Sequence, residues 1–327
     1  MNLICPDLFN TKLPPPCPFP GCVNCCSGPT SGRIIRYGYF RRSSDSRSVP
    51  RFRCLGCKRT FSRATVSLEF RQKKRRINFE LSVLLGSQVT QRRAALILGV
   101  NRKTVDRRVP LLGLKCRAEL EKDLESTPPA HEIQFDELET IEHTKLKPVS
   151  VPLAVDAKTR KILGFQVCQM PAKGLLAARS RHKYGPRADH RPAALNSLIL
   201  NLKPWVMDAT VFRSDSNPNY PALLKKHFPH QEHLQEISRR GSNVGQGEIK
   251  KGGFDPLFTL NHSCAMLRAN VSRLARKTWS TTKRIARLSD HIAIFVWYFN
   301  TIYLPYQQRQ GPVFRGTANS PQLEPRS

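Results

Sequence analysis

The sequence predicts a multidomain protein with a small cysteine-rich module, an all-α module and a larger mixed α/β domain. Three observations support this. Two pairs of closely spaced cysteines lie near the N-terminus, and a basic helical segment follows them. Beyond the proline-containing stretch "STPPAH" (126–131), strand-like runs alternate with helical ones to about residue 305. A chain of 327 residues is long enough for this arrangement.

The charge of the chain predicts a nucleic-acid partner. Lys and Arg number 54 against 24 Asp and Glu, which gives a formal net charge of +30. Such a field binds polyanions through the release of their counterions, whereas solubility requires only a few charges. The sequence shows no run of about 18 apolar residues, no signal peptide and no basic amphipathic stretch with exposed aromatics. We therefore expect a cytoplasmic, nucleoid-associated protein with no membrane partner.

The cysteine pairs predict one structural zinc ion. Four thiolates on two tight knuckles form a closed tetrahedral site, which replaces the core that so short a segment lacks. Gly56 is expected to permit the turn of the second knuckle, "RCLGCKRTF", which resembles that of zinc ribbons, where a following aromatic packs on the metal site. Cys25 is an alternative to one ligand of the first knuckle, "CPFPGC", because it forms a C-x2-C pair with Cys22. The preferred ligands are Cys17, Cys22, Cys54 and Cys57.

The segment "TQRRAALILGVNRKTVDRRV" (90–109) predicts two short helices around a sharp corner. Ala95 is small enough for the helices to cross closely, Gly99 can take a positive φ, and Asn101 can cap the second helix. These features are typical of a helix-turn-helix, whose second helix enters the major groove of DNA. The side chains expected to contact DNA are Arg102, Lys103, Thr104 and Arg107.

An acidic stretch stands out in this basic chain. "IQFDELETIEH" (133–143) holds four carboxylates, and it opens a series of three strands, helix, strand, helix, strand and helix. That order is the ribonuclease-H-like arrangement, in which an Asp on the first strand and an Asp ending the fourth strand come together. Here these residues are Asp136 and Asp215. Two such carboxylates can hold two Mg²⁺ or Mn²⁺ ions that activate a water or a 3′-OH and stabilise the leaving oxygen of a phosphodiester.

The modules in this order resemble the DDE transposases of small bacterial insertion sequences. The resemblance covers about residues 17–300 and is most specific in "FDELET" and in the helix with the pattern "LNH…LR…RLARKT". It implies that Asp136 and Asp215 are the first two catalytic metal ligands. It also implies that the protein cuts and joins double-stranded DNA at the element's ends and in a target, as a homo-oligomer.

The third catalytic ligand departs from the pattern. The related helix has Glu seven residues before the Arg of its "LR" pair, and here that position is Asn261. An amide oxygen can bind Mg²⁺ without a carboxylate's charge, so metal binding should be weaker, although some relatives also use Asn. Asp255 is the second candidate, yet it also fits the N-cap before Pro256. Glu248, in a Gly-rich loop, is a third.

The helix expected at about 256–278 also carries a basic track, since residues 256–289 contain no acid. We expect this track to bind the transposon end through Arg268, Arg273, Arg276 and Lys277. The apolar helix that follows, "SDHIAIFVWYFNTIYLPY" (289–306), is predicted to close the core, with Trp297 inside it. Two other functions remain open: a catalytically inactive DNA-binding regulator derived from a transposase, which the Asn favours, and a nuclease that cuts without joining.

The predicted boundaries follow these motifs. They are a flexible leader (1–16), a zinc ribbon (17–66), a helix-turn-helix domain (77–124), a ribonuclease-H-like catalytic domain (131–305) and a disordered tail (306–327).

Overall fold

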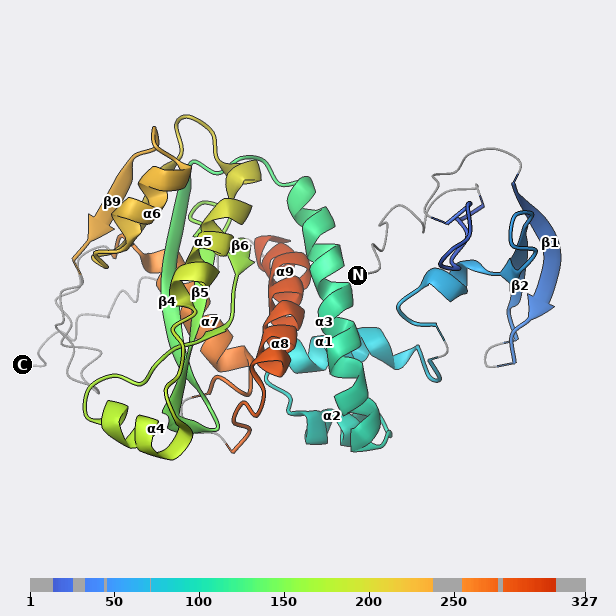
Figure 1. The fold of residues 1–327 in the computed structure, drawn as a ribbon, viewed down its shortest axis with the longest axis horizontal. Helices are drawn as coiled ribbons and strands as arrows, with labels where there is room; N and C mark the ends of the chain where they lie inside the picture. Colours follow the sequence, from blue (N-terminus) through green and yellow to red (C-terminus); the bar gives the residue numbers. More distant parts are fainter. Residues whose placement is uncertain are drawn as a thin grey trace, which may run out of the picture. The chain divides into compact units, whose positions relative to one another are not determined.

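The computed structural model describes residues 14–25, 33–43, 46–70, 72–237, 255–275 and 279–309 (Figure 1). The chain divides into two compact units. The first unit comprises Met1–Glu125, Ile141–Lys147 and Leu267–Phe295, and the second comprises Ser126–Thr140, Pro148–Met266 and Val296–Ser327.

The N-terminal part of the first unit is a three-stranded antiparallel sheet in the order β1-β2-β3. Its strands are Ile34–Arg41, Ser48–Cys54 and Thr60–Phe61. Because side chains alternate across a strand, β2 buries Phe52 and Cys54 on one face. These residues form a core with Cys17 and Phe61, so the aromatic after the second cysteine pair packs beside the thiols as expected.

Three helices follow in the same unit: α1 (Ile77–Gly86), α2 (Gln91–Ile97) and α3 (Arg102–Glu125). The Thr90 side chain caps α2 by accepting a hydrogen bond from the N–H of Arg93. Gly99 has a φ of +57° at the corner, and the Asn101 side chain accepts a hydrogen bond from the N–H of Lys103. The corner is as predicted. The second helix is not short, however: α3 has 24 residues, because its buried stripe continues beyond the motif through Leu112, Cys116 and Leu120.

The second unit contains most of a six-stranded sheet with the order β6-β5-β4-β8-β9, and β7 pairs with β5. Strand β8 runs parallel to both β4 and β9, whereas β6 and β7 run antiparallel to β5. The mixed α/β sheet with flanking helices is therefore confirmed. The strands are Glu132–Glu142 (β4), Thr144–Asp156 (β5), Ile162–Phe165 (β6), Cys168–Gln169 (β7), Val211–Asp215 (β8) and His233–Glu236 (β9).

The two faces of this sheet carry different helices. Phe135 of β4 and Phe212 of β8 lie on one face, where Phe135 packs against Tyr220 of α6 with ring centroids 5.0 Å apart. On the other face, the N–H of Leu260 in α7 donates to Oε1 of Gln134. The helices are Leu176–Tyr184 (α4), Arg191–Asn201 (α5), Tyr220–His227 (α6), Phe258–Asn270 (α7), Ile285–Tyr298 (α8) and Leu304–Arg309 (α9).

Two features of the helices differ from the sequence expectations, and one agrees with them. Helix α4 was not anticipated, and the helix expected to reach residue 278 ends at Asn270. Val271 and Leu274 remain buried in the turns beyond it, so the apolar spacing continued after the helix had stopped. Trp297 is buried within α8, as the core interpretation required. Among the described residues, no helix is long and apolar enough to cross a membrane.

Candidate metal centres

The four preferred cysteines come together in the first unit. Sγ of Cys17 lies 3.6 Å from Sγ of Cys57, and Sγ of Cys22 lies 3.6 Å from Sγ of Cys54. All four sulfurs lie within 4.8 Å of one another. Zn–S bonds of about 2.3 Å in a tetrahedron place the sulfurs about 3.8 Å apart, so this donor set fits one zinc ion. Cys25 is not a member of the group; its N–H donates to the carbonyl of Cys22 instead.

Hydrogen bonds to the sulfurs support a thiolate site. Nδ2 of Asn24 donates to Sγ of Cys54 over 3.2 Å, and the N–H of Asn24 donates to Sγ of Cys22 over 3.4 Å. Burial raises the pKa of Cys54, but N–H groups of Cys57, Asn24 and Gly56 outweigh it and lower the pKa to about 6. The role of Asn24 was not predicted from the sequence, although Asn24 lies between Cys22 and the alternative ligand Cys25.

Gly56 has a different role from the one expected. Its φ lies outside the positive range, so it is not needed for a left-handed turn. A Cβ at this position would lie 2.8 Å from Nδ2 of Asn24 and 3.5 Å from Sγ of Cys22. Glycine is therefore required because the two knuckles approach each other closely.

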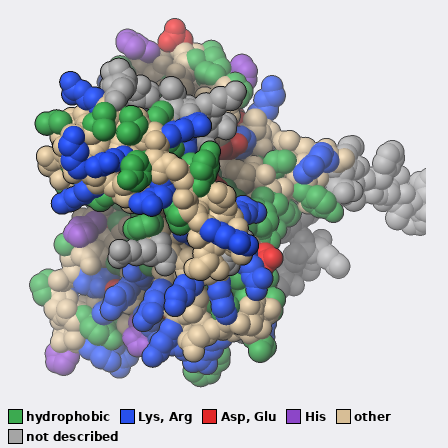
Figure 2. Space-filling model, turned by 90° about the vertical axis from the view of Figure 1, so that its right-hand side faces the viewer, with side chains coloured by type: hydrophobic (Ala, Val, Ile, Leu, Met, Phe, Trp, Pro, Cys, Tyr) green, Lys and Arg blue, Asp and Glu red, His purple; other side chains and the backbone are tan. Residues whose placement is uncertain are grey.

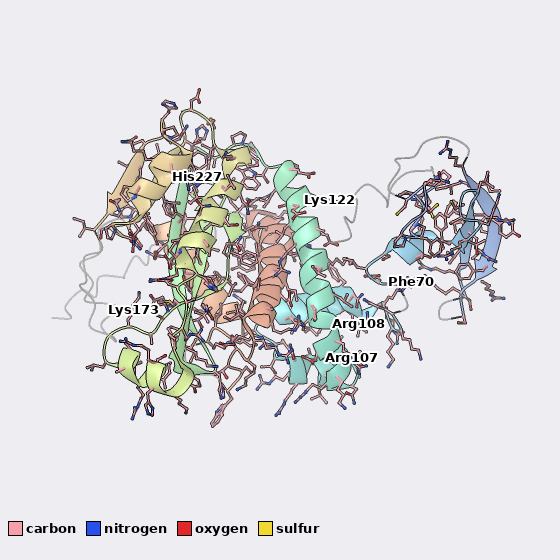
Figure 3. All side chains as sticks on the ribbon, viewed as in Figure 1. Phe70, Arg107, Arg108, Lys122, Lys173 and His227 are labelled. Carbon is pink, nitrogen blue, oxygen red and sulfur yellow. The ribbon has the colours of Figure 1, made fainter. Side chains whose placement is uncertain are left out.

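The start of α3 presents the expected basic surface. Arg102, Lys103 and Arg107 are exposed, whereas Thr104, next to the buried Val105, is half-buried, contrary to expectation. Arg108 is buried: its guanidinium donates to Oδ1 of Asn78 over 2.9 Å and to the carbonyl of Lys73. Figure 3 shows Arg107 and Arg108 near one end of α3 and Lys122 near the other.

The predicted basic track is only partly described. Arg268 lies on α7, but Arg273 follows the end of that helix and is half-buried. Burial lowers the pKa of Arg273, while Asp106 and Asp290 raise it. The helical placement of Arg273 is therefore wrong, and its charge faces carboxylates of the first unit. Arg276 and Lys277 lie outside the described residues.

Asp136 and Asp215 lie on adjacent parallel strands at the same level. The register pairs Ile133 with Phe212 and Gln134 with Arg213, so two residues further along it brings Asp136 opposite Asp215. Paired residues of parallel strands share a face. The two carboxylates therefore project from one face of the sheet: Asp215 ends β8, and Asp136 lies within the 11-residue strand β4.

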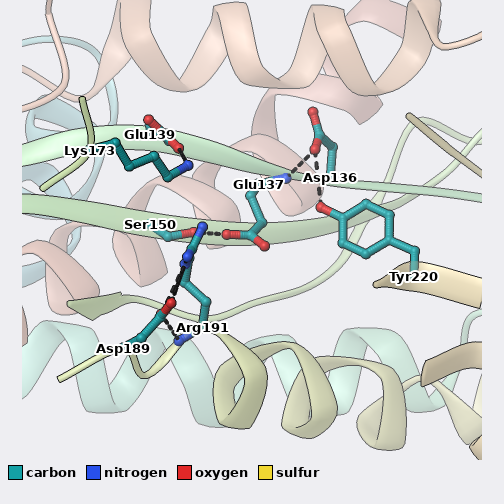
Figure 4. A network of polar contacts seen from close by, with 8 residues as sticks. All are labelled: Asp136, Glu137, Glu139, Ser150, Lys173, Asp189, Arg191 and Tyr220. Carbon is teal, nitrogen blue, oxygen red and sulfur yellow. Dashed lines mark hydrogen bonds and ion pairs between the residues drawn. The ribbon is translucent and has the colours of Figure 1, made fainter. Parts of the chain in front are cut away.

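Local hydrogen bonds orient both aspartates. Oδ1 of Asp136 accepts from the N–H of Glu137 over 2.6 Å and from the hydroxyl of Tyr220 over 3.3 Å (Figure 4). Oδ1 of Asp215 accepts from the N–H of Asn217 over 3.2 Å. Burial and the nearby charge of Asp215 raise the pKa of Asp136 from 3.8 to about 6. A cation bound between the two carboxylates would offset the repulsion between their charges, so the pair is a candidate metal site.

The other acids of the stretch are engaged elsewhere. Oε2 of Glu137 accepts from the hydroxyl of Ser150 over 2.6 Å, and Oε1 of Glu139 lies 2.9 Å from Nζ of Lys173. Because residues alternate across β4, both carboxylates leave from the face opposite Asp136. Figure 4 shows them apart from the pair formed by Asp136 and Tyr220. Glu137 and Glu139 therefore do not belong to the candidate catalytic centre with Asp136.

The start of α7 supplies the candidate third ligand. Gln134, two residues before Asp136 and on the same face, binds both Leu260 N–H and the carbonyl of Pro256. This brings the first turn of α7, with Asn261, to the face that carries the aspartates. Oδ1 of Asp255 accepts from the N–H of Leu257, as an N-cap does, and its Oδ2 accepts from Nδ2 of Asn261 over 2.9 Å. Glu248 lies outside the described residues.

Comparisons with known proteins add little to this geometry. No protein-family model matches the chain, and no curated protein matches it. Among solved structures, the catalytic domain of Mos1 mariner transposase matches 61% of this chain and 94% of its own, at 12% identity and a TM-score of 0.22. The Mos1 paired-end complex with Mn matches 72% of this chain and 80% of its own, at 11% identity and a TM-score of 0.23. At TM-scores this low, these similarities carry no argument about the function of this chain.

Proposed function

We propose that the protein is a DDE-type transposase of a bacterial insertion sequence, which cuts and joins DNA with Mg²⁺ or Mn²⁺. The observation that carries the proposal is the pair Asp136 and Asp215, in register on adjacent parallel strands of a mixed sheet. The strand order agrees with a ribonuclease-H-like domain. A net charge of +30 supplies the field that holds a DNA substrate.

Each residue of the centre has a distinct role. Asp136 and Asp215 would hold two divalent ions, which activate the attacking oxygen and stabilise the leaving oxygen when bound. The N–H of Glu137 and the hydroxyl of Tyr220 fix the Asp136 carboxylate, and the N–H of Asn217 fixes that of Asp215. These donors limit carboxylate rotation before metal and DNA arrive, which lowers the entropy lost on binding.

Asn261 is the third ligand of this proposal, and Asp255 positions it. The hydrogen bond to Asp255 engages the amide nitrogen of Asn261, which leaves its carbonyl oxygen as the atom for the metal. Asp255 is itself engaged in capping α7. The site then carries two negative charges in place of the three of a carboxylate triad, so metal binding is weaker than in such a triad.

The N-terminal modules serve DNA recognition in this proposal. A zinc ion holds the ribbon together through the four cysteines, and the exposed start of α3 reads the transposon end in the major groove. The protein acts on double-stranded DNA as a homo-oligomer, because joining requires two ends. A catalytically inactive regulator is the second candidate, and the uncharged Asn261 is the observation that favours it.

The direct test is a cleavage assay with the full chain. Duplex DNA carrying the sequences that flank the coding region is incubated with the protein and Mn²⁺, Mg²⁺ or EDTA. A transposase cuts at the boundaries of inverted repeats and joins the ends to a target plasmid, and only with the divalent ion. Tight binding to the flanks without cleavage under any condition would favour the regulator, and cleavage without joining would favour a nuclease.

Substitutions at the third position separate Asn261 from Asp255. Asn261→Asp restores a third negative charge and should keep or raise the cleavage rate. Asn261→Ala should lower the rate about 10–100-fold, as loss of a ligand or its orienting partner commonly does. Asp255→Ala should lower it less, because it loosens Asn261 without removing the metal-binding oxygen. A harmless Asn261→Ala beside an inactive Asp255→Ala would make Asp255 the ligand.

Arg107→Ala tests the reading surface of α3. Loss of a base contact should cost about 1–3 kcal/mol of binding to the specific end and less on random DNA. The matched control is Lys122→Ala, an exposed basic residue about 22 Å further along the same helix, which should leave sequence preference unchanged. Equal losses on both DNAs for Arg107→Ala would show that α3 is not the reader.

A further inference from the structure

The outer face of the ribbon sheet carries exposed aromatic side chains. Tyr37 is 46% exposed and Phe40 is 39% exposed, both on β1. A register shift after Arg36 pairs Phe40 with Val49, so Phe40 lies on the same face as Arg51 and Arg53, whereas Tyr39 pairs with Pro50 on the face of Phe52. The opposite face buries Phe52 and Phe61 against the cysteine cluster, so the core of the ribbon forms without the two exposed rings. Exposed rings gathered on one face and rimmed by polar side chains mark a candidate interaction site.

Two arginines flank the ring of Tyr37. Cζ of Arg53 lies 5.3 Å from the ring centroid of Tyr37, and Cζ of Arg51 lies 5.8 Å from it. Arg51 is held in place by a 3.0 Å hydrogen bond from Nη2 to Oγ1 of Thr60. The three strands contain no acidic residue. Figure 2 shows Lys and Arg side chains spread among hydrophobic ones on the face that it draws.

The combination of exposed aromatic rings and arginines favours one class of partner. A phosphate backbone alone would require cations and no aromatic rings, and an apolar protein surface would not match so many positive charges. Aromatic rings beside arginines are the arrangement that binds unpaired nucleotides: bases stack on the rings while the cations neutralise phosphates.

We propose that this face, defined by Tyr37, Phe40, Arg51 and Arg53, binds single-stranded DNA. The two aromatic rings stack on unpaired bases, and the two guanidinium groups bind the flanking phosphates. The surface does not depend on the catalytic centre, so a protein that cannot cut DNA would keep it.

The test uses the full-length, zinc-loaded protein in magnesium-free buffer. Fluorescence anisotropy measures binding to a labelled 20-nucleotide oligothymidine and to a mixed-sequence duplex of the same length, over a series of salt concentrations. Tyr37→Ala should weaken single-strand binding about tenfold and duplex binding less than twofold. The salt dependence should not change, because no charge is lost. Tyr37→Phe should restore binding, since the ring is retained.

Tyr306→Ala is the matched control, because Tyr306 is 54% exposed on α9, which is not part of the ribbon; this variant should bind single strands like the wild type. Zinc content is measured for every variant. If Tyr37→Ala lost zinc, Phe40→Ala, which removes the other ring of this face, would carry the same comparison. Equal losses on single strands and duplexes, or no loss with either substitution, would overturn the proposal.

Discussion

Asp136→Asn is expected to abolish DNA cleavage and joining while leaving DNA binding intact or slightly tighter. The substitution keeps the size of the side chain and removes one of the two charges that would hold the divalent ions. Removing a metal that contributes about 4 kcal/mol to the transition state lowers the rate about a thousandfold. Binding should not weaken, because the carboxylate repels DNA phosphates until a cation neutralises it. Product yield on gels and anisotropy with the same DNA give the two readouts.

Glu139→Gln is the matched control for that experiment. Glu139 lies on the same strand, but it points away from Asp136 and is half-exposed beside Lys173, with 53% of its side chain accessible. The cleavage rate of Glu139→Gln should stay within about twofold of the wild-type rate, because an exposed ion pair contributes little. If Asp136→Asn were as active as Glu139→Gln, the acidic stretch would be a solvated surface and the enzyme proposal would fall.

A stability measurement excludes misfolding as the cause of lost activity. The pKa of Asp136 is about 6 in the folded protein against 3.8 for an ordinary aspartate. The folded state therefore holds this proton more tightly, and stability falls as pH rises from about 4 to about 6. In metal-free buffer at pH 7, Asp136→Asn should be as stable as the wild type or more so, by up to about 3 kcal/mol. The difference should vanish below pH 4.

Cys54→Ser should cost the protein its zinc and the fold of the ribbon. Structural zinc contributes on the order of 10–16 kcal/mol to such modules, more than the small core around Phe52 and Phe61 can replace. Zinc content should fall from about one equivalent to near zero, and hydrogen exchange in residues 33–61 should become fast. Sequence-specific DNA binding should weaken, whereas the helices of the second unit should keep their protection.

Cys25→Ser is the control for the zinc site. Cys25 neighbours the cluster in sequence but is not one of its four sulfurs, so this variant should retain one equivalent of zinc. Unchanged zinc in Cys54→Ser, or loss of zinc in Cys25→Ser, would contradict the assignment.

The candidate metal ligands of both centres could be predicted from the sequence. The cysteine pairs are short-range motifs, and the two aspartates lie on strands whose apolar patterns mark them clearly. Asn24 escaped prediction because its contact with Cys54 joins two knuckles far apart in the chain. For the same reason, Gly56 was interpreted as a turn residue, whereas a neighbour 2.8 Å from its missing Cβ requires the glycine.

Helix ends were predicted less well than strands. Helix α4 has a single buried residue, Ser180, so it shows no apolar stripe to detect. Helix α3 extends past Pro110 because its apolar face remains buried. Beyond Asn270, the apolar spacing of α7 continues into turns that are also buried. The apolar periodicity of a sequence reflects the burial of its side chains, and side chains beyond the end of a helix can be buried as well. The contact between Asn261 and Asp255 was not predicted, because Asp255 was weighed only as a ligand or as an N-cap, whereas its carboxylate both caps α7 and accepts a hydrogen bond from Asn261.

The central claim, that Asp136, Asp215 and Asn261 surround a divalent ion, can be measured without DNA. Fe²⁺ replaces Mg²⁺ or Mn²⁺ in oxygen-ligand sites, and with ascorbate and peroxide it cuts the backbone beside its ligands. Mass spectrometry of the treated full-length protein should show cuts near residues 136, 215 and 261, suppressed by excess Mn²⁺ and absent in Asp136→Asn. Cuts confined to other segments, or a pattern unchanged by Asp136→Asn, would show that the aspartate pair does not hold a metal.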